Sequence, residues 1–363
     1  MQYTPLAWYA AALPKGEAVS FWLKILPVLT TLLFFAAQWL NRTYKTQITE
    51  ILVNCTYCFL GFIFILFSFS VILIYANVII KLLHIARPSS LTLVRLALGA
   101  AVLCSVFAFI NAHRTPKVKT IAVSSPLMQD GKEIKIIQLS DMHLGESVSV
   151  GQLERLVKKI EDIKPDLLLF TGDIFEHSNN KTERFIELVK SMSAPLGKFG
   201  VLGNHEYYRG GQRSEDFFAK SGIELIKNSS RETGPFNIIG VNDIRTTNLS
   251  KENFVKIIKE NVKADHINIL LSHTPYYFDE ADALGVNLML SGHTHRGQIW
   301  PFEYLNHIYF DDVYGPRKGK EGGLLYVTSG AFYWGPPMRF LTDNEIPLIA
   351  FSKENKQRRA ADL

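Results

Sequence analysis

The sequence predicts an α/β layered domain preceded by an all-α membrane region. Three long apolar segments lie within the first 113 residues. After residue 133, short apolar runs typical of buried strands alternate with amphipathic helical patterns, which favours an α/β arrangement. The chain of 363 residues is long enough for one large domain and a membrane region.

The apolar segments at residues 19–40, 51–80 and 91–110 predict three transmembrane helices. The second segment contains no charged residue, and it exceeds the length of about 20 residues that suffices to cross a bilayer. Helices are expected because lipid offers the backbone no hydrogen-bond partner. The cysteines of the chain all lie in the second and third segments: Cys55, Cys58 and Cys104. We interpret them as helix-packing residues, because no second pair accompanies the C-x-x-C as it would in a zinc site.

Charge is distributed unevenly along the chain. Residues 1–113 contain seven Lys or Arg and two Asp or Glu, whereas residues 114–363 contain 32 of each kind. The C-terminal part therefore lacks the basic surface of a nucleic-acid-binding protein, and we expect no nucleic-acid partner. With three spans, the loops on the side of the C-terminal part are slightly more basic than those on the other side. Basic loops tend to stay in the cytoplasm, so we expect a multi-pass protein of the bacterial inner membrane with its C-terminal part in the cytoplasm.

The rest of the chain divides into a connector at 114–132, an α/β domain at 133–352 and a polar tail at 353–363. Apolar runs predict an edge strand at 120–123 and further strands at 133–139, 166–170, 200–202, 236–241, 267–271, 286–290, 324–328 and 346–351. Helical spacing of apolar residues predicts helices at 153–163, 185–192, 214–220 and 250–259. The region 300–335 is rich in aromatic residues, Gly and Pro, and is expected to be a loop cap that shapes specificity.

Five short polar motifs follow apolar runs of the predicted domain: S-D-M-H-L-G at 140–145, T-G-D at 171–173, G-N-H-E at 203–206, S-H-T-P at 272–275 and G-H-T-H at 292–295. Open α/β sheets gather such residues at the carboxyl ends of their strands. Carboxylates, imidazoles and an amide oxygen suit divalent cations. The motifs hold too many ligands for one ion and enough for two, if one carboxylate bridges them, and two ions about 3.5–4 Å apart can clamp a phosphate.

The order D-x-H, G-D, G-N-H-E, H and G-H-x-H resembles the calcineurin-like metallophosphoesterase family over residues 133–352. The resemblance implies a four-layer αββα sandwich with a dinuclear site at its mouth. It implies a first metal held by Asp141, His143 and His295, and a second held by Asn204, His273 and His293. Asp173 would bridge the two ions. The ions would be divalent, with Mn the first choice and Fe, Zn, Mg or Co the alternatives.

The same resemblance implies that His205 steadies the phosphate and protonates the leaving oxygen, and that Glu206 orients His205 through a hydrogen bond. Two arginines after the motifs, Arg296 and Arg339, are candidates for binding a phosphate bidentately, although an ion pair is the commoner fate of an arginine. His177 is more simply explained as a residue of a surface loop.

These features predict a membrane-bound dinuclear-metal phosphoesterase that cleaves a phosphodiester or pyrophosphate. The S-D-x-H-L-G opening, the G-H-T-H-x-G-Q block and the late R-F resemble the membrane-anchored bacterial branch of the family, which includes phosphodiesterases and a UDP-diacylglucosamine pyrophosphatase. That resemblance implies a lipid-linked substrate and contact with membrane lipids. One alternative is a non-catalytic sensor or scaffold, which is disfavoured because no metal ligand is missing. A nuclease is disfavoured by the balanced charge. A protein phosphatase is a further alternative, because the metal motifs alone do not distinguish it from a phosphodiesterase.

Overall fold

The computed structural model describes residues 17–84, 88–208 and 211–353. The chain forms two compact units. The first contains the N-terminal helices up to His113, together with the short segments Ile299–Pro301 and Gly335–Leu341. The second contains the remainder of the chain from Arg114.

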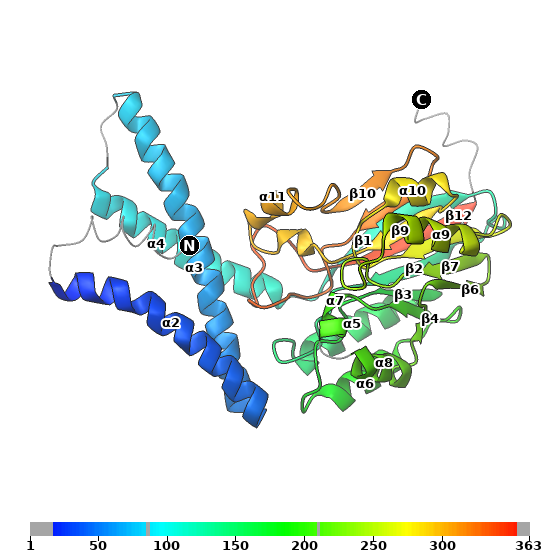
Figure 1. The fold of residues 1–363 in the computed structure, drawn as a ribbon, viewed down its shortest axis with the longest axis horizontal. Coiled ribbons are helices and arrows are strands. Elements are labelled where there is room, and N and C mark those ends of the chain that lie inside the picture. Colours follow the sequence, from blue (N-terminus) through cyan, green and yellow to red (C-terminus); the bar gives the residue numbers. More distant parts are fainter. Residues whose placement is uncertain (1–16, 85–87, 209–210, 354–363) are drawn as a thin grey trace. The chain divides into compact units, whose positions relative to one another are not determined.

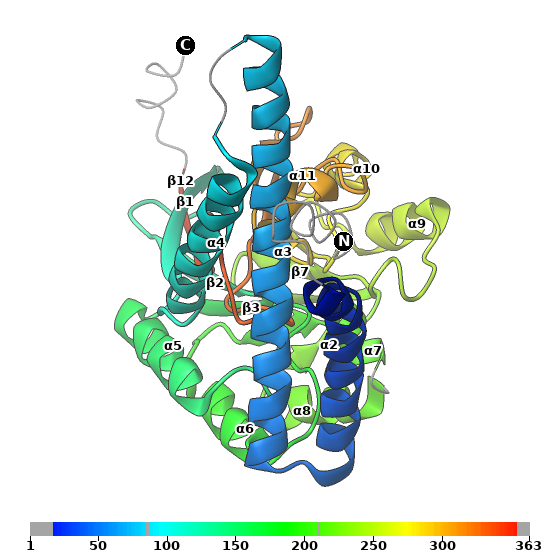
Figure 2. The ribbon, with the colours of Figure 1, turned by 90° about the vertical axis from the view of Figure 1, so that its left-hand side faces the viewer.

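The described part of the first unit is built on three helices, α2 (Glu17–Tyr44), α3 (Gln47–Leu82) and α4 (Ser90–Ala112). Thr46 caps α3 by accepting a hydrogen bond from the backbone N–H of Thr49, and Ser89 caps α4. Figure 2 shows α2 and α4 on either side of the long helix α3. Among the described residues, α3 and α4 are the helices long and apolar enough to cross a membrane, which matches the second and third expected spans. The first expected span lies in α2, and its crossing of the membrane remains a prediction.

Two segments from late in the sequence pack with these helices. Ile299, Met338 and Phe340 form an apolar cluster with residues of α3 and α4. The backbone of Arg339 is fixed at the C-terminal part of α4, because its N–H donates to the carbonyl of Ala108 at 2.9 Å and its carbonyl accepts from the Asn111 side chain at 3.2 Å. Of the region expected to be a loop cap, the two ends, residues 300–301 and 335, belong to the helical unit, and Phe302–Trp334 belongs to the second unit.

The second unit contains two six-stranded sheets, with the strand orders β1-β12-β2-β3-β4-β5 and β10-β11-β9-β8-β7-β6. The strands of the first sheet are β1 (Lys117–Ser125), β2 (Ile134–Leu139), β3 (Leu167–Thr171), β4 (Lys198–Val201), β5 (Glu224–Leu225) and β12 (Glu345–Lys353). Those of the second are β6 (Ser229–Thr233), β7 (Phe236–Gly240), β8 (Ile267–Leu271), β9 (Leu288–Ser291), β10 (Gly315–Lys318) and β11 (Leu324–Val327). Both sheets are mixed, since β12 pairs antiparallel with β2 and β10 pairs antiparallel with β11.

The main core lies between the two sheets. Ile136 and Leu169 of the first sheet share one buried cluster with Ile238, Ile269 and Leu290 of the second. The neighbouring residues of each strand point to the opposite face, because side chains alternate along a strand. Since both faces of the inner strands are buried, these strands are continuous apolar runs in the sequence.

Helices cover the outer faces of the sheet pair, as Figure 1 shows. On the first sheet lie α5 (Val150–Ile163), α6 (Thr182–Ser191) and α8 (Gly211–Lys220); on the second lie α9 (Lys251–Asn261) and α10 (Phe278–Ala283). Phe254 of α9 and Phe278 of α10 belong, with Ile239, to the buried outer cluster of the second sheet. Three short elements complete the unit: α7 (Asn204–Tyr208), the 3-10 helix η1 (His295–Gly297) and α11 (Phe302–Asn306). The four-layer αββα fold predicted for this domain is confirmed.

The predicted elements agree with most of the inner strands, and β8 has the predicted bounds. Strands β5, β6 and β10 were not predicted, because they are short edge strands with polar sequences such as Ser229–Thr233. The edge strand expected at 120–123 is longer, since β1 pairs with β12 over nine residues. The domain boundaries remain predictions, and the expected tail lies outside the described residues beyond Lys353.

Candidate metal centre

The five polar motifs lie at the carboxyl ends of five strands, all in the second unit. Asp141 and His143 follow β2, Asp173 follows β3, and Asn204 follows β4 in the first sheet. His273 follows β8, and His293 and His295 follow β9 in the second sheet. The loops are tied to one another, because the N–H of His143 donates to the carbonyl of Asp173 at 2.9 Å. Both sheets therefore contribute to one site.

Two glycines of the motifs permit this close approach. A Cβ atom on Gly203 would lie 2.3 Å from Oδ1 of Asp173. A Cβ atom on Gly292 would lie 2.2 Å from Oδ2 of Asp141. Real Cβ atoms do not approach other atoms this closely, so any side chain at either position would displace a carboxylate.

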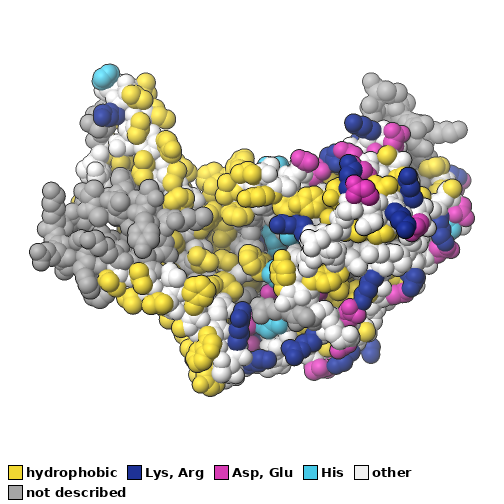
Figure 3. Space-filling view, in the orientation of Figure 1, with side chains coloured by type: hydrophobic (Ala, Val, Ile, Leu, Met, Phe, Trp, Pro, Cys, Tyr) yellow, Lys and Arg dark blue, Asp and Glu magenta, His cyan; other side chains and the backbone are white. Residues whose placement is uncertain are grey.

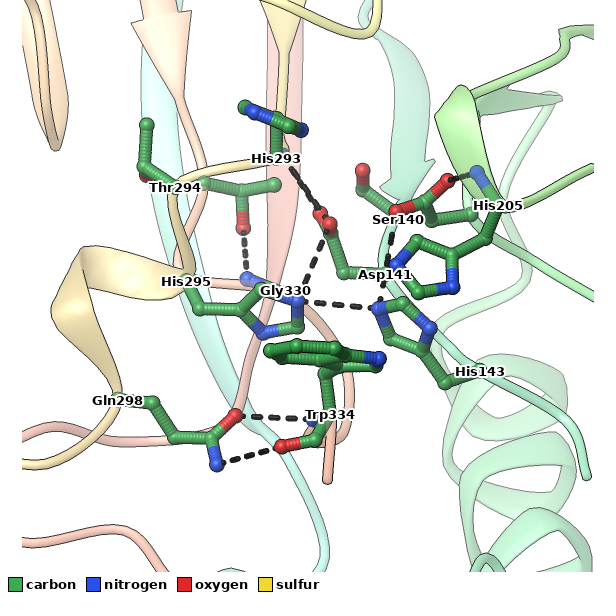
Figure 4. A network of polar contacts seen from close by, with 12 residues as sticks. Ser140, Asp141, His143, His205, His293, Thr294, His295, Gln298, Gly330 and Trp334 are labelled. Carbon is green, nitrogen blue, oxygen red and sulfur yellow. Dashed lines mark hydrogen bonds and ion pairs between the residues drawn. The ribbon is translucent and has the colours of Figure 1, made fainter. Parts of the chain in front are cut away.

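The first cluster consists of Asp141, His143 and His295. Nε2 of His143 lies 3.0 Å from Nε2 of His295, and the latter atom lies 3.4 Å from Oδ1 of Asp141. Figure 4 shows the two imidazoles converging beside the Asp141 carboxylate. Nδ1 of His143 contacts Oε2 of Glu176 at 2.9 Å, so in the neutral ring the proton is on Nδ1 and Nε2 presents a lone pair to the cluster.

The second cluster consists of Asp173, His273 and His293. The amide oxygen of Asn204 lies 3.1 Å from Nε2 of His273 and 2.9 Å from Nδ1 of His293. Nδ1 of His273 lies 2.8 Å from the carbonyl oxygen of Thr171, which fixes a donor on that nitrogen and leaves Nε2 facing the cluster. Carboxylate, amide and imidazole atoms thus meet at one point, which is a donor set that fits a divalent cation.

The Asp173 carboxylate lies between the two clusters. Its Oδ2 atom is 3.2 Å from Nε2 of His273 and 3.8 Å from Nε2 of His143. The side chain is almost fully buried, and its other oxygen accepts the N–H of His205 at 2.9 Å. Asp173 is therefore placed where one carboxylate can reach two ions.

The electrostatics of the site also favour positive charge between these groups. Burial raises the pKa of Asp141, and the charge of Asp173 raises it further against the effect of the histidines. Burial lowers the pKa of His273, but the nearby carboxylate of Asp173 raises it more, so it lies well above its usual value. Burial and then the charge of His273 lower the pKa of His293 to about 3. Buried carboxylates therefore favour positive charge beside them, either on the His273 ring or on a cation.

Comparison with known proteins agrees with this geometry. The family model for Calcineurin-like phosphoesterase matches residues 134–297. An uncharacterised metallophosphoesterase of Helicobacter pylori is 31% identical over 284 residues, which are 76% of this chain and 75% of that protein. The chain belongs to the calcineurin-like phosphoesterase family. The members of this family are metal-dependent phosphoesterases.

Two further relatives show how far the similarity extends. An uncharacterised metallophosphoesterase of Campylobacter jejuni is 31% identical over 66% of this chain, and the match spans 64% of that relative's length. A Danio rerio protein described as a transmembrane protein with metallophosphoesterase domain is 26% identical over 71% of this chain and 62% of its own length. The similarity of this calcineurin-like phosphoesterase thus extends to bacterial and animal proteins.

His205 lies beside the metal clusters of this calcineurin-like phosphoesterase. Its Nδ1 atom lies 3.0 Å from Oε1 and 2.9 Å from Oε2 of Glu176. Burial lowers the pKa of His205, but the hydrogen bond with Glu176 and the charge of Asp173 raise it more, so it lies above its usual value. The contact with Glu176 therefore favours the protonated form of the ring, which a general acid requires.

The predicted hydrogen bond between Glu206 and the His205 ring is wrong. Oε1 of Glu206 accepts the backbone N–H groups of Ile174 and Phe175, and Oε2 accepts those of Asp173 and Gly203. The two residues are consecutive in α7, and consecutive side chains of a helix point about 100° apart, so Glu206 is directed inward while His205 faces the clusters. Burial and then the charge of Asp173 raise the pKa of Glu206 to about 8, against the lowering effect of the backbone donors.

Glu176 takes the role predicted for Glu206. Its carboxylate bonds to both His143 and His205. Burial raises the pKa of Glu176, but the hydrogen bonds from the two histidines lower it more, so it lies far below its usual value. The only sequence signal for this residue is its position three residues after Asp173.

Trp334 is a second residue that the sequence did not identify. Its ring lies 5.5 Å from that of His205, and half of it is exposed. Gln298 fixes its backbone through two hydrogen bonds of 2.9 Å, one to the carbonyl and one from the N–H (Figure 4). Trp334 thus provides an accessible aromatic wall beside His205.

The two candidate arginines differ in their surroundings. Nε of Arg296 lies 3.2 Å from Oε1 of Glu303, and the guanidinium lies 4.4 Å from the centre of the Tyr314 ring. Arg296 thus has the ion pair that was the alternative to phosphate binding. Arg339 is fully buried and belongs to the helical unit, so a role in substrate binding remains a prediction for it. His177 pairs with Glu146 at 2.5 Å.

Proposed function

We propose that this protein is a membrane-bound hydrolase that uses two divalent cations to cleave a phosphodiester or pyrophosphate bond. The observation that carries the proposal is the position of Asp173, whose Oδ2 atom lies within 4 Å of a histidine of each cluster. A single bridging carboxylate between two ligand sets suits a dinuclear centre rather than two separate sites.

The proposed roles follow from the contacts within the site. Asp141, His143 and His295 would hold one ion, and Asn204, His273 and His293 would hold the other, with Asp173 within reach of both. When bound, the two cations neutralise the phosphate and lower the pKa of the attacking water. Glu176 keeps His143 and His205 oriented, and His205 donates the proton to the leaving oxygen. Glu206 holds the Asp173 loop through its backbone N–H groups.

The proposed substrate is an amphiphilic phosphate ester, such as a lipid-linked pyrophosphate. The support is the presence of α3 and α4, two helices long and apolar enough to cross a membrane, in the same chain as the metal centre. The Danio rerio relative is itself described as a transmembrane protein. A bacterial inner-membrane location with the metal centre in the cytoplasm, a third span in α2, and phosphate binding by Arg339 are part of this proposal, whereas the ion pair with Glu303 occupies Arg296.

Hydrolysis of bis(p-nitrophenyl) phosphate by the purified full-length protein tests the proposed chemistry. We expect activity that depends on added divalent metal, with Mn compared against Fe, Zn, Mg and Co. Asp173→Ala should lower kcat/KM by about 10³-fold or more, since it removes a ligand common to both ions. Asp265→Ala is the matched control, because its side chain is 82% exposed and lies away from the motifs. Activity that survives in Asp173→Ala would contradict the proposal.

A further inference from the structure

Five exposed hydrophobic side chains gather on α11 and the turn that follows it. They are Phe302, Tyr304, Leu305, Ile308 and Tyr309, and we name them the α11 surface. Three of them, Tyr304, Ile308 and Tyr309, are 65%, 70% and 71% exposed. Figure 3 shows hydrophobic side chains over the position of α11 in Figure 1. The single acidic residue within this stretch, Glu303, is neutralised by its ion pair with Arg296.

The segment that carries the α11 surface is well ordered by its own contacts. The N–H groups of Tyr309 and Phe310 both donate to the carbonyl of Asn306 at 2.9 Å. The Asn306 side chain is buried and donates to the carbonyl of Thr294 at 2.8 Å. The Phe310 ring is also buried and meets the His293 ring at 5.4 Å. Some apolar side chains of this segment thus enter the core while others are held outward on a fixed backbone.

The chain leads directly from this segment into the helical unit. Phe302 is bonded to Pro301, and Ile299–Pro301 belongs to the unit of the N-terminal helices. The N–H of Trp300 donates to the carbonyl of Phe340, and the neighbouring Arg339 is hydrogen-bonded to Ala108 near the end of α4. The end of α4 is where the apolar helix gives way to the polar domain.

The length of the connection limits how far the α11 surface can be from this boundary. Each residue spans at most about 3.6 Å, so the Cα atom of Tyr304 lies within about 11 Å of that of Pro301. The polar boundary layer on each side of a bilayer is about 5–7.5 Å deep, since the hydrocarbon core of about 30 Å widens to 40–45 Å with both headgroup layers included. The α11 surface is therefore tethered within reach of the headgroup layer.

We propose that the α11 surface lies in the interfacial layer of the membrane that α3 and α4 cross. Tyrosine suits this layer because its ring is apolar and its hydroxyl is polar. The aliphatic side chains of Leu305 and Ile308 supply the apolar area that interfacial binding needs. A bilayer held beside this surface by the chain's own helices has a high effective concentration, which favours lipid over a soluble partner.

This placement has a consequence for the substrate, which rests on the proposed function. Asn306 and Phe310 pack on the loop that carries His293 and His295. A surface seated among lipid headgroups would bring that loop, and with it the metal centre, next to the phosphate groups of amphiphiles. Such a substrate would reach the site without leaving the membrane.

Spin labels on the full-length protein in lipid nanodiscs test the placement directly. Cys55, Cys58 and Cys104 are replaced by Ala, and a nitroxide is attached at Tyr304→Cys or Ile308→Cys. The control is Lys256→Cys on α9, where the native side chain is 73% exposed. We expect the labels at 304 and 308 to collide readily with oxygen and rarely with a water-soluble nickel complex, and the control label to do the reverse. Labels at 304 and 308 that are as open to nickel as the control would overturn the proposal, as would labels shielded from both reagents, which indicate a protein partner.

A second measurement keeps the native cysteines. Tyr304→Trp adds a tryptophan whose fluorescence should be quenched by brominated lipids, whereas a tryptophan added by Lys256→Trp should not be quenched. Equal quenching of the two additions would overturn the placement even if the cysteine-free protein fails to fold.

Activity separates this inference from the proposed function. The triple variant Tyr304→Ser, Ile308→Ser, Tyr309→Ser should cleave soluble bis(p-nitrophenyl) phosphate within about twofold of the wild-type rate. It should cleave an amphiphilic phosphodiester in vesicles about tenfold more slowly than the wild type, because interfacial binding scales with buried apolar area. Equal effects on the two substrates would refute access from the membrane. If the wild-type protein cleaves no phosphate ester, the proposed function fails, while the spin labels still decide where the α11 surface lies.

Discussion

Replacing Glu206 by Gln should destabilise the fold, because this carboxylate holds a backbone loop. Oε1 accepts two N–H groups at 2.7 and 3.0 Å, and Oε2 accepts two more at 2.9 and 2.7 Å. The side chain is fully buried, so water cannot replace a lost acceptor. In Glu206→Gln one oxygen becomes an amide NH₂ group, which has no lone pair and faces two donors.

The expected magnitude follows from these four hydrogen bonds. Two buried N–H groups lose their acceptor at about 1–3 kcal/mol each, which gives a loss of roughly 4 kcal/mol in the free energy of unfolding. A domain of this size loses about 2–4 °C in Tm per kcal/mol, so Tm should fall by about 8–16 °C. The loop that carries Asp173 should also become less well defined, and metal affinity should fall.

The assay compares Tm and kcat for Glu206→Gln and Glu176→Gln in the Mn-loaded full-length protein. Bound cations favour the ionised form of Glu206, so the native protein has all four hydrogen bonds. Glu176 orients two histidines through its carboxylate, so Glu176→Gln should lower kcat by about 10–100-fold and Tm by only about 2 °C or less. A Glu206→Gln variant with native Tm and a large loss of kcat would refute this reasoning, and would restore Glu206 as the residue that orients His205.

Other variants test the remaining features of the site. Elemental analysis should find about one ion per chain in His273→Ala and in His295→Ala, because each removes a ligand of one ion. Asp173→Ala should lose both ions, and an unchanged metal content in this variant would contradict a shared carboxylate. Gly203→Ala should lower metal affinity by at least about tenfold because its Cβ would lie 2.3 Å from Oδ1 of Asp173, while Gly211→Ala, which has open space around its Cβ, should bind metal normally. Arg296→Ala should change KM by less than about threefold, because Arg296 is paired with Glu303; a tenfold increase would show that it binds the phosphate.

Much of this site could be predicted because its ligands belong to short motifs at strand ends. Parallel strands such as β2 and β3 end at the same edge of a sheet, so Asp141 and Asp173 had to lie near each other once the strands were identified. The inner strands were also identifiable, since burial on both faces gives continuous apolar runs such as Ile267–Leu271.

The features that the sequence did not predict depend on direction or on distant contacts. Two glutamates lie near His205, and adjacency in sequence favoured Glu206, but the geometry of α7 turns Glu206 away and leaves Glu176 from another loop to bond the ring. Arg339 follows a Pro-rich stretch that indicates only a loop, and its packing with α4 depends on contacts more than 200 positions apart in the sequence. The α11 surface likewise lacked a sequence signal, because its apolar residues are interleaved with buried ones and form no long run.

Anomalous X-ray diffraction from crystals grown with Mn is the most direct test of the dinuclear centre. The account predicts two peaks about 3.5–4 Å apart, with the Asp173 carboxylate between them and His143 and His273 on opposite sides. A single peak, or two peaks of which only one contacts Asp173, would contradict it.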